Sequence, residues 1–152
     1  LVSTHNPMGT INNSDLELAG TIAHHNTLVH AIDMREQTCH TLCDNTPAVA
    51  WQRKGSTSTI GPAAYLLRVQ ALHQRFYRYV FRIYHIPGVV NAMADAASRR
   101  WELNDSQLIS FFSSTYPQST PWTQCTLRPR MDSALTSALC KTRSKPESYL
   151  AA

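Results

Sequence analysis

The chain has 152 residues, of which 43% are hydrophobic, and a formal net charge of +4. This length suits one domain with an appendage, and the hydrophobic content is sufficient for a core. Its four cysteines lack the spacing of a disulfide framework, and no stretch has the apolar length of a membrane span or the pattern of a signal peptide. We therefore expect an intracellular protein, in the cytoplasm or nucleus, with no membrane partner.

Charge is distributed unevenly along the sequence. Residues 1–52 carry one basic and five acidic residues, whereas residues 53–100 carry eight basic residues and a single acid, Asp95. Such a combination is typical of a nuclease, in which cations hold the phosphate backbone and carboxylates hold metal ions. A solvated surface with a chance asymmetry explains the same counts.

The first elements in chain order are a helix, a strand and a short helix. Apolar residues recur at helical spacing over residues 15–31, which predicts a helix with one buried face. Residues 37–43 are rich in β-formers and lead into Asp44, so this carboxylate stands where a strand ends. Thr46 and the following proline then supply an N-cap and a first turn for a helix over residues 46–51.

The alternation continues as far as residue 99. Residues 55–59 predict a loop, residues 61–75 a helix and residues 79–86 a strand, after which a Pro-Gly turn leads into a short helix that contains Asp95. Strands separated by helices are parallel neighbours in a sheet covered on both faces, with sites at their carboxyl ends. The sequence therefore predicts an α/β fold in the order α-β-α-α-β-α.

Three acids fall where such a sheet would place a site: Glu17 in the first helix, Asp44 at a strand end and Asp95 after the other strand. Converging carboxylates repel one another unless cations lie between them, and oxygen ligands favour Mg²⁺ or Mn²⁺. Two ions about 3.5–4 Å apart would activate water for phosphodiester cleavage. The structural alternatives are a capping box from Ser14 to Glu17 and a capping turn at Asp44.

Two further features have ordinary structural interpretations. Cys39, His40 and Cys43, with three upstream histidines, offer a zinc site, but no second Cys/His pair stands at zinc-finger spacing. Trp51 suits base stacking, although its spacing from its apolar neighbours favours packing.

Three segments, in the same order as in the family, resemble the active-site motifs of ribonuclease H domains in retrotransposon reverse transcriptases. The most specific match is the last, with His85-Ile86-Pro87-Gly88, Asn91, Ala94-Asp95 and Ser98-Arg99. Residues 13–18 resemble the helix of the catalytic Glu, and residues 42–45 resemble the strand-ending Asp. The resemblance implies that Glu17, Asp44 and Asp95 bind two Mg²⁺ or Mn²⁺ ions that cut the RNA strand of an RNA–DNA hybrid.

The family has a fourth acid, on an opening β-hairpin well upstream of the Glu. Among the sixteen residues before Glu17 only Asp15 is acidic, and its side chain points in a different direction from that of Glu17. We therefore expect a ribonuclease H-like mixed sheet flanked by helices but lacking its opening strands. Leu1-Val2-Ser3 would be a remnant of the third strand. We expect this chain to be inactive by itself, and its exposed sheet edge would be a surface for aggregation or for a partner.

Five basic residues flank the helices between the two aspartate motifs and are candidates for contacts to the backbone of the hybrid. They are Arg53, Lys54, Arg68, Arg75 and Arg78. Such contacts carry affinity without sequence preference, and a solvated helix face is the alternative for each.

The composition changes after residue 103, because 19 of the 49 residues from 104 to 152 are Ser, Thr or Pro. We expect a partial ribonuclease H-like domain over 1–103 and a linker or tail over 104–152, with short amphipathic helices at 105–112 and 131–140. The resemblance implies an upstream reverse transcriptase region of the same polyprotein as a partner. The alternative function is a non-catalytic or degenerate nucleic-acid-binding or connecting module of a retroelement polyprotein.

Overall fold

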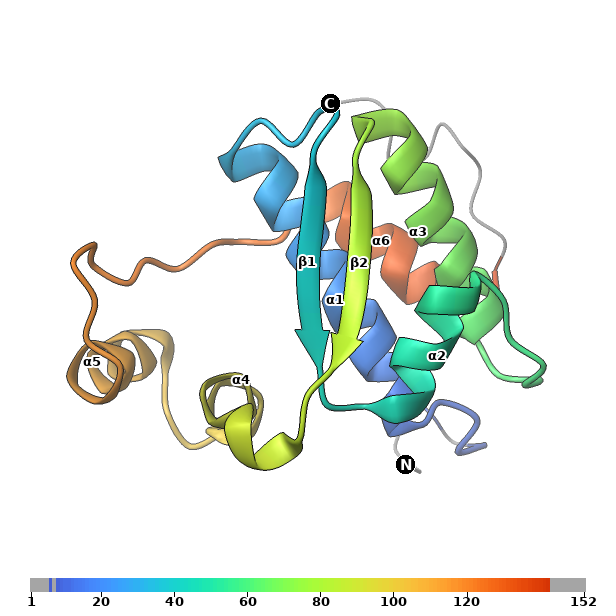
Figure 1. Ribbon diagram of the computed structural model, residues 1–152. Helices are drawn as coiled ribbons and strands as arrows, with labels where there is room; N and C mark the ends of the chain where they lie inside the picture. Colours follow the sequence, from blue (N-terminus) through green and yellow to red (C-terminus); the bar gives the residue numbers. More distant parts are fainter. Residues whose placement is uncertain (1–5, 7, 143–152) are drawn as a thin grey trace. The chain divides into compact units, whose positions relative to one another are not determined.

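The computed structural model describes residue 6 and residues 8–142, so the expected strand remnant at residues 1–3 lies outside the described part. The described residues form a mixed α/β structure with two strands and six α-helices (Figure 1). The elements are α1 (Asn13–Ala31), β1 (Thr38–Cys43), α2 (Thr46–Lys54), α3 (Ala63–Tyr77), β2 (Val80–His85), the 3₁₀ turn η1 (Gly88–Val90), α4 (Ala92–Arg99), α5 (Asp105–Thr115) and α6 (Pro129–Leu139). The α/β class and the order of elements through α4 confirm the sequence prediction.

The chain divides into two compact units, which differ from the expected division at residue 103. One unit combines the described residues up to His85 with those from Leu127 to Thr142, and the other is Ile86–Thr126. No helix of the described part is both long and apolar enough to cross a membrane.

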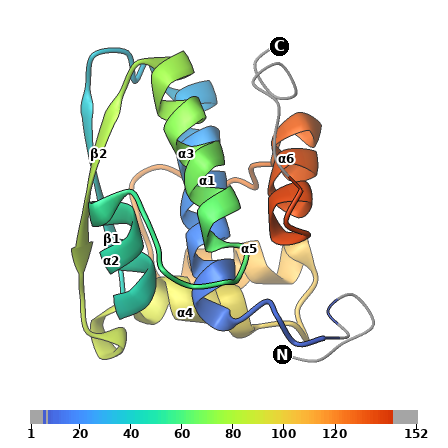
Figure 2. The same cartoon turned by 90° about the vertical axis from the view of Figure 1, so that its right-hand side faces the viewer.

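The first unit is built in layers on a two-stranded parallel sheet. β1 pairs with β2 from Thr38 opposite Val80 to Cys43 opposite His85. Figure 2 shows the sheet at one side, α1 and α3 against it, and α6 beyond those two helices. The parallel pairing requires a crossover, and α2 and α3 supply it.

The core of this unit lies between the sheet and α6. α1 contributes Leu18 and Ile22, α3 contributes Leu66, and α6 contributes Met131 and Leu135, all of them buried. The division at residue 103 followed the high Ser, Thr and Pro content of the segment from 104 to 152. The amphipathic helix expected at 131–140 is α6, and its apolar stripe packs against α1 and α3 as part of the core.

Only one face of the sheet is covered within this unit, whereas the sequence predicted cover on both. Thr41, Cys43 and Ile83 point toward the helices and are buried, whereas Leu42 and Tyr84 are 58% and 41% exposed. The alternation along β1, and along β2 as far as Tyr84, reflects the side-chain period of two, which turns successive residues to opposite faces.

A buried polar network joins α1 to β1 and α3. The ring Nε2 of His25 lies 2.8 Å from Thr41 Oγ1, and Asn26 Nδ2 donates to His73 Nε2 at 3.2 Å. Because Nε2 of His73 accepts, its Nδ1 carries the proton and donates to the Tyr79 hydroxyl at 2.9 Å. Burial lowers the pKa of His25 to about 4 and that of His73 to about 3, so both rings are neutral near pH 7.

The second unit is held by an aromatic cluster of its own. Phe112 packs against Trp122, whose Nε1 donates to the Tyr116 carbonyl at 2.9 Å. Asn104 caps α5 in a capping box with Gln107, which fixes where this helix begins.

Candidate functional site

The start of α1 positions Glu17 without using it as a cap. Asn12 is the N-cap residue: its Oδ1 accepts from the Asp15 N–H at 3.1 Å, and its own N–H donates to Asp15 Oδ2 at 2.9 Å. The capping box therefore begins two residues earlier than the alternative from Ser14 to Glu17 requires. Glu17 lies in the next half-turn, partly buried.

The turn after β1 likewise leaves Asp44 out of the cap. Asn45 caps α2 by accepting the Ala48 N–H at 3.0 Å, one residue before the predicted cap Thr46, and Pro47 lies in the first turn as expected. Asp44 is partly buried between the end of β1 and this cap. The Asp44 carboxylate therefore lies at the end of β1 and does not serve as the N-cap of α2.

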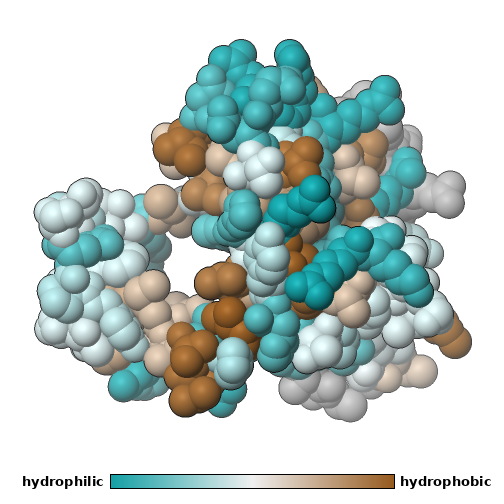
Figure 3. All heavy atoms as spheres, in the orientation of Figure 1, coloured by the Kyte–Doolittle hydropathy of each residue, from teal (hydrophilic) through white to brown (hydrophobic). Residues whose placement is uncertain are grey.

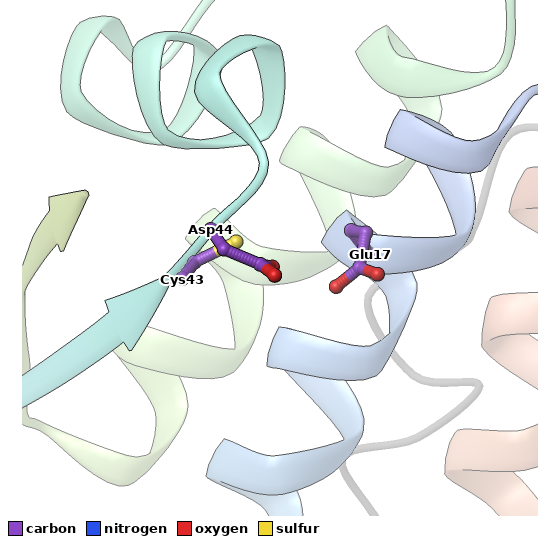
Figure 4. A group of neighbouring side chains, drawn as sticks. All are labelled: Glu17, Cys43 and Asp44. Carbon is purple, nitrogen blue, oxygen red and sulfur yellow. The ribbon is translucent and has the colours of Figure 1, made fainter. Parts of the chain in front are cut away.

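These two local structures bring Glu17 and Asp44 together. One oxygen of each carboxylate and the sulfur of Cys43 all lie within 4.8 Å of one another. Figure 4 shows the carboxyl groups of Glu17 and Asp44 pointing toward each other between α1 and the end of β1. Two carboxylates at such a distance repel unless a cation or a proton lies between them, so the arrangement suits a cation.

Cys43 is the member of this cluster that the sequence prediction missed. Burial raises the pKa of its thiol, the Asn45 backbone N–H lowers it, and the negative charges of Glu17 and Asp44 raise it further. The thiol is therefore neutral near pH 7 when no cation is bound. The signal in the sequence was the alternation of β1, which turns Thr41 and Cys43 inward together.

Asp95, the third predicted acid, belongs to the second unit. It lies in the first turn of α4, partly buried, and forms an ion pair with Arg99 one turn later. That Asp95 shares a metal site with Glu17 and Asp44 stays a prediction.

The predicted backbone contacts are all exposed, but they differ in their partners. Arg53 Nε donates to the Ile83 carbonyl at 3.0 Å, and Arg78 is ion-paired with Glu36. Lys54 ends α2, and Arg68 and Arg75 lie two turns apart on α3. Arg78 would have to give up this ion pair to contact a phosphate.

The alternative zinc site finds no support among the described residues. No group of three potential ligands there combines Cys39 or His40 with the upstream histidines. Instead, His25 is hydrogen-bonded in the core, and His40 stacks on Tyr84. Trp51 packs against the core, as its spacing predicted.

In comparisons with known proteins, no family model, curated protein or solved structure matches the chain.

Proposed function

We propose that the chain is a ribonuclease H-like domain of a retrotransposon reverse transcriptase polyprotein, which hydrolyses the RNA strand of RNA–DNA hybrids with Mg²⁺ or Mn²⁺. The observation that carries this proposal is the meeting of Glu17 and Asp44 at the carboxyl end of β1. Glu17 and Asp44 are two of the three acids that the motif resemblance assigns to the metal site, and the fold brings them together from segments 27 positions apart.

The chemistry follows from the donor set. The carboxylates of Glu17 and Asp44 would bind divalent ions, with Asp95 of α4 as the third acid. Ions held there would supply activated water and stabilise the leaving oxygen. The exposed cations on α2 and α3 would hold the phosphate backbone of the hybrid. The resemblance also implies a fourth acid, and neither β1 nor β2 carries one.

The first test measures Mn²⁺ binding by the full chain, either by calorimetry or from the electron paramagnetic resonance signal of the free ion. Glu17→Gln and Asp44→Asn should each weaken binding at least about tenfold, because even indirect partners of metal ligands contribute 10- to 100-fold. Cys43→Ala should leave Mn²⁺ affinity unchanged, since hard cations prefer oxygen. Asp33→Asn is the matched control, an exposed acid paired with Arg35. Equal affinity in all variants would refute the metal site.

Hydrolysis is measured on a labelled RNA–DNA hybrid with Mg²⁺, using the full chain and, if the gene encodes further residues before Leu1, the chain extended by them. Asp44→Asn should lower the rate at least about 100-fold, because a metal site contributes several kcal/mol of transition-state stabilisation. Equal cleavage by the wild type and this variant would refute the catalytic role.

A second candidate is a non-catalytic nucleic-acid-binding or connecting module. The ion pair between Asp95 and Arg99 favours it, because a paired carboxylate is a poorer metal ligand. Salt-sensitive binding of the hybrid without cleavage, in the extended chain with Mg²⁺, would support this alternative.

A further inference from the structure

The outward face of the β1–β2 sheet is a polar and aromatic surface whose own residues take no part in the proposed nuclease chemistry. Arg53, a candidate for contacts to the hybrid, lies beside it. Three cross-strand pairs form it, and all six side chains are exposed: Thr38 with Val80, His40 with Arg82, and Leu42 with Tyr84. We call these residues the open face. It contains a cation and two rings but no acid, so its charge complements an anionic partner.

The rings of the open face are already ordered. His40 and Tyr84 are stacked, with ring centroids 5.6 Å apart and planes 20° from parallel. Arg53, at the end of α2, reaches this surface from the free edge of β2: its Nε donates to the Ile83 carbonyl, and its Cζ lies 6.0 Å from the Tyr84 ring centroid. The hydrogen bond uses one of the five N–H donors of the guanidinium.

A cavity lies beside the ring of Tyr84. Its volume is ≈ 540 Å³, and its lining combines Arg53 and Arg82 with Phe81, Tyr84 and two glutamines of α2 and α3. Figure 3 shows the sheet from this side, where hydrophobic and strongly hydrophilic residues lie next to one another. Arginine guanidinium groups bind phosphates through paired hydrogen bonds, and aromatic rings beside them can stack on bases.

The neighbouring acids do not compensate this surface. Asp33 and Glu36, in the segment before β1, are each paired with their own arginine, Arg35 and Arg78. Within the described part of the chain, Arg82 has no ion pair. The cation of the open face, Arg82, is therefore available to a ligand.

We propose that the open face binds single-stranded nucleic acid, with a base stacked on Tyr84 and backbone phosphates on Arg53 and Arg82. A single strand fits better than a duplex, because the bases of a duplex are stacked on one another and do not offer their faces to a side chain. The surface is distinct from the Glu17 and Asp44 cluster, which lies on the α1 side of the sheet, and it needs no divalent ion (Figures 1 and 4).

The test measures fluorescence anisotropy of labelled 20-mers of dT and rU with the full chain in EDTA. Tyr84→Ala should weaken binding about 5- to 100-fold, the range for losing one stacked base, whereas Tyr84→Phe should retain affinity. Tyr84→Leu keeps an apolar side chain without a ring and should behave as Tyr84→Ala. Arg82→Gln should reduce the slope of log K against log salt by about 0.7. Circular dichroism checks that each variant is folded.

Two matched controls separate this proposal from its alternatives. Arg35→Gln removes an exposed, already paired arginine and should leave affinity unchanged. Glu17→Gln should also bind normally, so failure of the metal site and failure of the open face are distinguishable.

Several results would overturn the proposal. They are equal affinity for wild type and Tyr84→Ala, full affinity in Tyr84→Leu, and binding restricted to duplexes. Concentration-dependent dimerisation that Tyr84→Ala abolishes would instead assign the face to a second copy of the chain.

Discussion

His25 and His73 are fully buried, and neither forms an ion pair with another described residue. They are tolerated because Thr41, Asn26 and Tyr79 supply hydrogen bonds to neutral rings. Burial lowers both pKa values, and the charges of neighbouring histidines lower them further, so protonation would place a cation where water cannot solvate it.

Acid should therefore destabilise the fold over a defined pH range. The folded-state pKa values of about 4 for His25 and about 3 for His73 lie below the ordinary value of 6.5, so the unfolded chain binds more protons at intermediate pH. Stability is fully present above pH 6.5 and falls as pH drops toward 4, by an amount on the order of several kcal/mol. Urea unfolding at pH 7.5, 6 and 5 measures this, and the exposed His40→Gln variant should keep the same pH dependence. A stability that is constant across this range would contradict the buried neutral network.

At the scale of elements, sequence patterns located the helices and strands well and their caps less well. Apolar spacing predicted α1, α3, α5 and α6, and β-rich composition predicted β1 and β2. The cap positions differ by one or two residues because Asn12, Ser14, Asn45 and Thr46 are all good N-cap residues. Which of them is used depends on where the backbone turns into the helix.

The α1 capping box should contribute measurably to stability. Asn12→Ala removes the acceptor for the Asp15 N–H, and we expect a loss of about 1 kcal/mol in the free energy of unfolding. Asn13→Ala is the matched control, because Asn13 is exposed and already within the helix. Chemical denaturation at pH 7.5 measures both. Equal effects of the two substitutions would show that Asn12 does not act as the cap.

At the scale of the whole molecule, the first unit combines segments that are distant in the sequence, and sequence reasoning did not predict this. The helix α6 was expected, but composition averaged over residues 104–152 assigned it to a tail, whereas four of its residues are buried in the first unit: Met131, Ala134, Leu135 and Ala138. In the candidate site, local patterns found Glu17 and Asp44, whereas the alternation of β1 turned Cys43 inward without showing that it would lie beside them.

If α6 is part of the core, substitutions in it should destabilise the unit. Leu135→Ala should lower the free energy of unfolding by about 2–5 kcal/mol, as expected for a buried leucine. Thr136→Ala, at the exposed neighbouring position, should change it by less than about 0.5 kcal/mol. Urea denaturation followed by circular dichroism compares the two. If α6 did not pack against the unit, neither substitution would change the free energy of unfolding.

The parallel pairing of β1 with β2 has a consequence for the order of folding events. The two strands cannot meet until the segment between them, with α2 and α3, has been synthesised, and α6, which closes the core over α1 and α3, follows more than 100 residues after α1 begins. During synthesis, α1 and α3 must therefore leave the ribosome with apolar surface still exposed. Such long-range contacts slow folding, and the exposed apolar surface of α1 and α3 is prone to aggregation until residue 139 has left the ribosome.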